Sequence, residues 1–188
     1  MTDRRFNLRF VLVMSAFVGV VLLTYREEVL EPALRPLDVA TATVTGALLE
    51  WTGLDVVREG TRIYQPGGFI YWINYSCTCI LPVAFLVVAV LAYPGRLRRK
   101  IPGIAVGVPL LLGLNQIRLV SLFYIGTYRP SIYDLAHLVV WESLMIIAII
   151  AIWWAWARWA DANGALQPAP GTRRRPYGTG LAIPFTRR

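Results

Sequence analysis

Side chains able to do covalent chemistry are scarce in this sequence. The only histidine is His137, and the only cysteines are Cys77 and Cys79. A thiolate is a strong nucleophile, and an imidazole can move protons near neutral pH. Arg118 lies in an otherwise apolar stretch, where a guanidinium can hold a developing oxyanion or a substrate carboxylate. These residues predict thiol catalysis; they are too few for a zinc site, so no metal or other cofactor is expected.

Two further polar residues could support these groups. Asn115 precedes Arg118 by one helical turn and is predicted to share its face. Asp134 precedes His137 by three residues and would either orient the imidazole or cap a helix. Glu142 is an acidic residue within an apolar stretch and could pair with Arg118. Taken singly, each has an ordinary structural explanation, such as capping, filling space or reaching toward lipid headgroups.

The composition predicts that membrane helices position these residues. Of the 188 residues, 56% are hydrophobic and 16% are charged, whereas about a quarter are charged in soluble proteins. A membrane helix needs about 20 apolar residues. Three stretches are long enough, and a fourth becomes so if the aromatic run 69–72 extends it; the four predicted spans are 8–25, 79–93, 101–125 and 135–156. The first span lacks a signal-peptide cleavage site and is predicted to be a retained anchor.

The basic residues predict the orientation of these spans. Thirteen of the 19 Lys and Arg residues lie before the first span, in the loop 94–100 or after the last span, and those segments carry +11 against −3 for the remainder. Because positive segments stay in the cytoplasm, both termini are predicted to be cytoplasmic, in a multi-pass protein of the cell inner membrane. Cys77, Arg118 and His137 then meet at one depth on the outer, extracytoplasmic side. The charge of +8 is thereby explained without a nucleic-acid partner.

The predicted fold class is an all-α integral membrane protein, a bundle of four transmembrane helices with possible short interfacial or re-entrant helices. Its predicted parts are a cytoplasmic N-terminus (1–7), a membrane-embedded catalytic domain (8–157) and a disordered, Arg/Pro/Gly-rich cytoplasmic tail (158–188). The outward segment 26–76 would hold an interfacial helix at 37–51 and two short strands around a Glu-Gly turn at 54–64. After a break at 66–68, residues 69–74 would be extended or begin a helix.

Three motifs together resemble the exosortase/archaeosortase family. They are Ser-Cys-Thr-Cys-Ile at 76–80, Asn-Gln-Ile-Arg-Leu-Val at 115–120, and His137 within Asp-Leu-Ala-His. The family patterns are Cys-(Ser/Thr/Asn)-Gly-Ile, Asn-x-x-Arg-(Ile/Val) and a histidine at the start of a later span. The segments 91–94 and 119–126 look most like the exosortase H branch, and the resemblance covers about residues 55–157. Cys79 departs from the pattern, because it stands where the family has glycine.

The resemblance implies a membrane-embedded cysteine transpeptidase. Its partners would be exported proteins whose C-terminal signal consists of a short motif, a hydrophobic span and a basic tail. The enzyme would cleave at the motif through a thioester and transfer the protein to an acceptor. By the same match, Cys77 would be the nucleophile, Arg118 the transition-state stabiliser and His137 the general acid/base, with Asn115 in support.

Two other functions remain open from the residues alone. A membrane thiol-disulfide oxidoreductase would use Cys77 and Cys79 as a redox pair, and Cys79→Ser should then abolish activity, whereas a transpeptidase should tolerate this change. A non-catalytic membrane assembly factor would use its polar residues only to join helices, and Cys77→Ser should then be silent.

Overall fold

The computed structural model describes residues 12, 15, 19 and 27–162. The first predicted span therefore lies almost entirely outside the described residues, as does the predicted tail beyond residue 162. The described elements, in chain order, are α2 (Glu27–Trp51), β1 (Val57–Glu59), β2 (Arg62–Tyr64), β3 (Ile70–Trp72), the 3-10 turn η1 (Tyr75–Cys77), α3 (Ile80–Ala92), α4 (Leu97–Tyr128), the 3-10 turn η2 (Pro130–Ile132), the π-helical segment η3 (Leu135–Trp141) and α5 (Glu142–Ala162).

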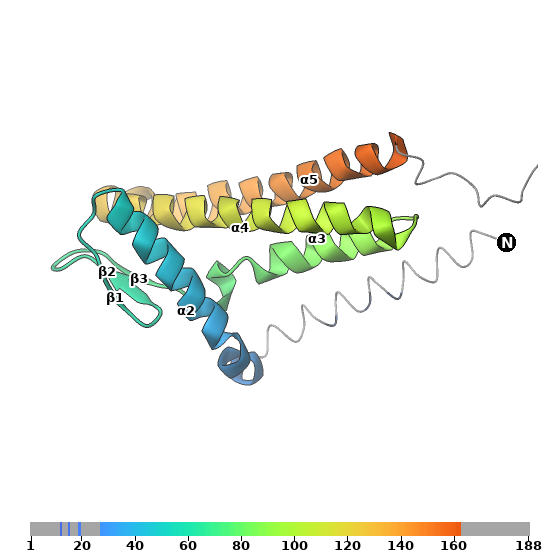
Figure 1. The fold of residues 1–188 in the computed structure, drawn as a ribbon. Helices are drawn as coiled ribbons and strands as arrows, with labels where there is room; N and C mark the ends of the chain where they lie inside the picture. The colour runs from blue at the N-terminus through green and yellow to red at the C-terminus, as the bar shows by residue number, and fades with distance from the viewer. Residues whose placement is uncertain (1–11, 13–14, 16–18, 20–26, 163–188) are drawn as a thin grey trace, which may run out of the picture.

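Helices α3, α4 and α5 run side by side, whereas α2 crosses them obliquely at the end that carries the sheet (Figure 1). Fully buried Leu86 of α3 and Leu111 of α4 share a core with Met145 and Ile149 of α5. Gly107 lets α3 and α4 approach closely, since a Cβ there would lie 2.6 Å from the Leu86 side chain. The three-helix core is thus held by interdigitated apolar side chains.

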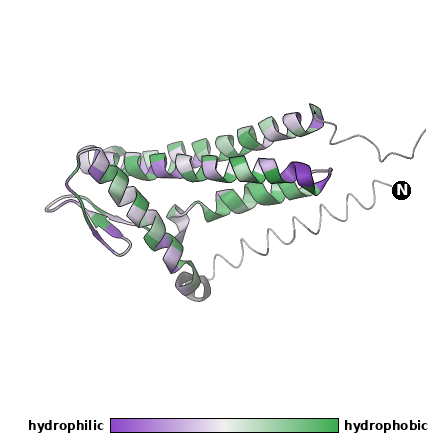
Figure 2. Cartoon of the chain, in the orientation of Figure 1, coloured by the Kyte–Doolittle hydropathy of each residue, from purple (hydrophilic) through white to green (hydrophobic). Residues whose placement is uncertain are grey.

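Two helical segments are long and apolar enough to cross a membrane, Leu97–Tyr128 and Leu135–Ala162. They correspond to the predicted spans 101–125 and 135–156. Large apolar side chains on their outer surfaces are exposed, among them Val106 at 60%, Ile117 at 61% and Ile147 at 60%. Figure 2 shows hydrophobic residues along most of α3, α4 and α5, with hydrophilic residues where α4 begins. A surface this apolar suits lipid rather than water.

The prediction for the span 79–93 was wrong in its length. Residues 70–72 of the aromatic run form β3, so the run does not extend the helix, and α3 has only 13 residues. At 1.5 Å per residue α3 rises about 20 Å, against about 30 Å of hydrocarbon. Four complete transmembrane helices are therefore not found among the described residues.

The predicted hairpin at 54–64 is confirmed. Strands β1 and β2 are antiparallel, with Glu59 opposite Arg62, and Gly60 has the positive φ that its turn requires. The extended alternative for 69–74 is also confirmed, because β3 pairs with β2 after the break at Gly67 and Gly68. The three-stranded sheet, in the order β1-β2-β3, corrects the all-α assignment.

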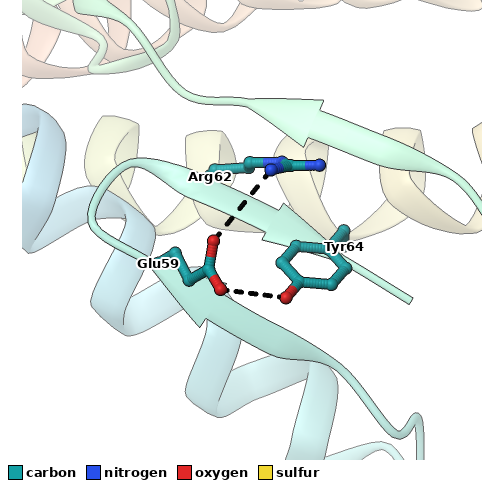
Figure 3. Close-up of polar contacts among 3 residues, drawn as sticks. All are labelled: Glu59, Arg62 and Tyr64. Carbon is teal, nitrogen blue, oxygen red and sulfur yellow. Dashed lines mark hydrogen bonds and ion pairs between the residues drawn. The ribbon is translucent and has the colours of Figure 1, made fainter. Parts of the chain in front are cut away.

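The outer face of the sheet is joined by polar and aromatic contacts across all three strands. Figure 3 shows the polar contacts among Glu59, Arg62 and Tyr64, on β1 and β2. The Tyr64 hydroxyl donates a hydrogen bond of 3.0 Å to Glu59, whose other oxygen lies 4.0 Å from the Arg62 guanidinium. The same guanidinium lies over the rings of Tyr64 and Trp72, at 4.7 and 5.4 Å from their centroids. Exposed ion pairs contribute little alone, so the stacked Arg62 is the main link between the strands here.

The inner face of the sheet packs against α2 and α4. Ile63, Tyr71 and Ile73 belong to one buried cluster with Leu119, Leu122 and Phe123 of α4 and with Ala42 and Leu49 of α2. Phe69, just before β3, meets the Phe123 ring edge-on at 5.7 Å. This packing fixes the sheet, and with it the chain leading to Cys77, against the last turns of α4.

Helix α2 is longer than the predicted 37–51. It begins at Glu27 and includes Pro32 and Pro36 within its first turns. Its buried Thr45 donates a hydrogen bond of 2.8 Å to the Gln116 side chain of α4. The helix therefore packs on the bundle along the same turn of α4 that carries Asn115 and Arg118.

The loop between α3 and α4 lies beside the end of α5. The Tyr93 hydroxyl donates to both carboxylate oxygens of Asp161, at 2.7 and 2.8 Å, and the Trp156 indole donates to the Arg99 carbonyl at 3.0 Å. The basic segment 96–100 and the end of α5 thus share one end of the bundle. His137 and the last turns of α4 lie at the other end, as the charge distribution predicted (Figure 1). Which end faces the cytoplasm stays a prediction.

We expect Gly126→Ala to destabilise the fold where α4 meets the sheet. A Cβ at Gly126 would overlap the Phe69 ring, which cannot turn away because Phe123 and Tyr133 pack against it. Overpacking of this kind costs about 1–3 kcal/mol. Thermal unfolding in detergent should show a lower midpoint for Gly126→Ala. Gly113→Ala on the same helix is the control, because nothing lies within 4 Å of a Cβ there; equal midpoints for both variants would contradict the packing described.

Candidate functional site

Cys77 ends the short turn η1, five residues after β3. Its backbone N–H donates to the Asn74 carbonyl at 2.8 Å, which closes the turn, and its side chain is buried at 6% exposure. The thiol donates a long contact of 3.5 Å to the Asn74 side-chain oxygen. The thiol therefore has one weak acceptor and is held in place by its own turn.

Asn115 connects Cys77 to α4. Its side-chain N–H donates to the Cys77 carbonyl at 2.7 Å, and the residue is 1% exposed. Asn115 and Arg118 are both buried on the side of α4 that faces the sheet and η1, which confirms the predicted shared face. One helical turn of α4 thus holds the backbone of the thiol residue and carries a buried cation.

Arg118 reaches from α4 to His137. Its Nη2 lies 3.3 Å from His137 Nε2, and the arginine is 9% exposed. A guanidinium has only donors, so Nε2 must accept, and His137 is then neutral with its proton on Nδ1. The Arg118 Nε, also buried, has no hydrogen-bond partner among the described residues. The structure therefore brings together Arg118 and His137, which are 19 residues apart in sequence.

No carboxylate within the described part of the chain pairs with Arg118. The suggested pair with Glu142 was wrong, since Glu142 is exposed and the guanidinium contacts His137 instead. Among the described contacts, the Asp134 side chain neither caps η3 nor hydrogen-bonds His137, so its supporting role stays a prediction. A buried charge without a counter-ion is costly, so this site favours the arrival of an anion.

His137 lies in η3, a π-helical segment at the start of the last membrane helix. The wider turn of a π-helix is rare and often found at functional sites. The ring of Tyr133 stacks on the imidazole at 5.8 Å with the planes 9° apart. This stacking, together with the bond to Arg118, fixes the orientation of the imidazole from two sides.

A comparison with known protein families identifies the family of this chain. A family model described as Transmembrane exosortase matches residues 6–141. The chain belongs to the transmembrane exosortase family. The match includes all three motifs and confirms the predicted family, and with the two apolar helices it identifies an exosortase-family membrane protein. Neither a curated protein nor a solved structure matches the chain significantly.

Cys79 stands where the exosortase pattern has glycine, and the backbone conformation of Cys79 explains why glycine suits this position. Cys79 precedes α3 with φ 63° and ψ 15°, the only non-glycine residue with positive φ among those described. A side chain there costs about 1–2 kcal/mol. The buried Cys79 thiol partly offsets this cost by contacting the Leu111 carbonyl at 3.7 Å. The two thiols face different partners and are free, which does not favour the redox-pair alternative.

Two tyrosines at this exosortase site were not predicted from the sequence. Tyr71 of β3 shares the buried cluster of Cys77, and Tyr133 packs on His137 and Phe69. Alternation in the run 69–74 was the available signal, because alternate side chains of a strand face the same side. Because the sequence alone is compatible with either a strand or the beginning of a helix at 69–74, that alternation could not be used.

We expect Cys79→Gly to be more stable than Cys79→Ala by about 1 kcal/mol. Both changes remove the thiol, and only alanine keeps a Cβ in the left-handed conformation. Unfolding of the two variants in mixed micelles measures the difference directly. Higher stability of the alanine variant would mean that the positive φ carries no strain.

Asn115→Ala should destabilise the protein by about 1–3 kcal/mol, because it leaves the buried Cys77 carbonyl without its donor. It should also change the alkylation rate of Cys77, since η1 is no longer held to α4. The matched control is Ile117→Ala, on the same helix but 61% exposed. A loss of stability in Ile117→Ala as large as that in Asn115→Ala would argue against a specific role for this hydrogen bond.

Proposed function

We propose that this exosortase-family protein is a membrane cysteine transpeptidase that processes exported proteins at a C-terminal sorting signal. The observation that carries the proposal is the buried Arg118, which has no carboxylate partner and lies one helical turn after the asparagine that holds Cys77. A cation kept in this way stabilises a thiolate or an oxyanion. Family membership supports the same activity.

In the proposed first step, the Cys77 sulfur attacks the scissile carbonyl carbon. The Arg118 guanidinium turns toward the developing oxyanion and leaves His137 Nε2, whose lone pair then accepts the thiol proton. A C–S bond forms, the C–N bond breaks, and the imidazolium gives its proton to the leaving amine. The resting Arg118–His137 bond thus couples oxyanion stabilisation to proton transfer.

In the second step, an acceptor nucleophile attacks the thioester carbonyl and gives its proton to His137. The C–S bond breaks, and the sulfur leaves as a thiolate that is reprotonated. The substrate would carry a short motif, a hydrophobic span and a basic tail; its span would lie beside the apolar surfaces of α4 and α5 in the lipid bilayer. Cys77, Arg118 and His137 would face the outer side of the cell inner membrane.

The test is co-expression of the full chain with an exported reporter that carries such a C-terminal signal. Cys77→Ala should abolish removal of the tail, and Arg118→Ala should slow it by about 10²–10³-fold, the cost of removing an oxyanion donor. His137→Ala should also lose processing. Cys79→Ser and Arg129→Ala should retain it, because Cys79 contacts only the bundle core and Arg129 is exposed at the end of α4.

A chemical trap tests the thioester itself. Added hydroxylamine should release the reporter as a hydroxamate at its new C-terminus, and only when Cys77 is present. Processing by Cys77→Ala at the wild-type rate, or release without hydroxamate at saturating hydroxylamine, would exclude a Cys77 thioester.

A further inference from the structure

Tyr71 brings a polar group into the core beside the candidate nucleophile. Its neighbours in β3, Ile70 and Trp72, are exposed at 44% and 63%, whereas Tyr71 is 5% exposed because strand side chains alternate. The buried cluster that contains Tyr71 also contains Cys77 and Phe123. The hydroxyl of Tyr71 is therefore carried to the thiol side of the sheet.

That hydroxyl has no well-formed hydrogen bond in the resting protein. It is buried, and it meets the geometry of a hydrogen bond with none of the described residues, although the Cys77 thiol and the Tyr133 hydroxyl lie close enough to interact with it weakly. A buried donor without a partner lowers stability, and phenylalanine would fill the same space without this cost. The presence of this hydroxyl is explained if it gains a strong hydrogen-bond partner during the reaction.

The surroundings of the hydroxyl define what that partner is. Burial first, and the Cys77 thiol second, raise the pKa of Tyr71 far above its ordinary value, so the phenol stays protonated and is available as a donor. Burial and then Cys77 likewise raise the pKa of the half-buried Tyr133. The titratable and charged groups around the sulfur thus come from β3 (Tyr71), α4 (Arg118) and the η2–η3 link (Tyr133), with His137 of η3 bonded to Arg118.

Loss of its proton changes the Cys77 sulfur from a hydrogen-bond donor into a hydrogen-bond acceptor. The Cys77 thiol now donates to the Asn74 oxygen at 3.5 Å, an atom that can offer nothing to an anion. A thiolate needs donors, and the Tyr71 hydroxyl is the neutral donor in its cluster that has no well-formed hydrogen bond with the described residues. The weak contact between Tyr71 and Cys77 would thus become a strong hydrogen bond when the thiol loses its proton.

We propose that the Tyr71 hydroxyl is a catalytic hydrogen-bond donor that stabilises the Cys77 thiolate, alongside the Arg118 cation. The proposal rests on the role of Cys77 as the nucleophile in the proposed function. It adds a residue of β3 to a site otherwise built from η1, α4 and η3. It also gives the inner face of the sheet a chemical role besides packing.

The experiment measures alkylation of Cys77 by iodoacetamide against pH, using the full chain in nanodiscs with Cys79→Gly so that one thiol remains. Tyr71→Phe should move the half-maximal pH upward by about one unit, the effect of one charge-assisted hydrogen bond, and so lower the thiolate fraction about tenfold below that pH. The unfolding midpoint should not fall, because the lost hydroxyl had no well-formed hydrogen bond. Tyr64→Phe on β2 is the matched control and should leave the half-maximal pH unchanged.

A second variant covers the case in which Tyr71→Phe does not fold. Difluorotyrosine at position 71 keeps the shape and makes the phenol a stronger donor, so the half-maximal pH should move downward. An unchanged half-maximal pH, a fall in the unfolding midpoint of Tyr71→Phe, or the same shift in Tyr64→Phe would overturn the proposal. The result is independent of processing: failure of Cys77→Ala to block processing overturns the transpeptidase function, whereas the thiol titration tests Tyr71 alone.

Discussion

The burial of Arg118 without a carboxylate is the constraint around which the rest of the site is arranged. A guanidinium at 9% exposure needs compensation, and here it receives only the lone pair of His137. That single contact sets the tautomer of the imidazole and ties the last turns of α4 to η3. An added carboxylate would satisfy the cation permanently and leave it less able to bind a transient anion. In the proposed function, the missing counter-ion would leave Arg118 available to the reaction, and the surrounding packing must carry its cost.

That packing comes from the sheet and from α2, so the small sheet acts as a support for the site. Phe69 and Tyr71 press on Phe123 and Tyr133, and Asn115 closes the gap by binding the Cys77 backbone. Cys77 lies on a turn rather than in a helix, yet the chain on both sides of it is held in place, by β3 before it and by α3 after it. Arg62, stacked on Tyr64 and Trp72, stiffens the opposite face of the same sheet.

Much of this organisation could be predicted from the sequence, because it depends on strong local signals. Apolar length and basic flanks predict α4, α5 and the end of the bundle at which Arg118 and His137 meet. Spacing predicts that Asn115 shares a face with Arg118. The features that could not be predicted from the sequence also have physical reasons. The aromatic run before Cys77 fits a strand or a helix, and only pairing with β2 decides for the strand. The π-helical form of η3, which carries His137, is encoded by no short motif. Tyr71 is found only once the register is known.

The shortness of α3 bears on how deep a substrate would have to reach in the proposed function. The helix begins three residues after Cys77 and ends just before the basic loop, and its rise of about 20 Å covers only two thirds of a hydrocarbon layer of about 30 Å. If the basic loop lies at one membrane surface, as the charges predict, Cys77 would lie below the other surface. A polypeptide that reached it would have to enter the layer, where its peptide groups need partners that lipid cannot supply. The length of this helix would then set how much of a transmembrane segment is left below the proposed point of cleavage.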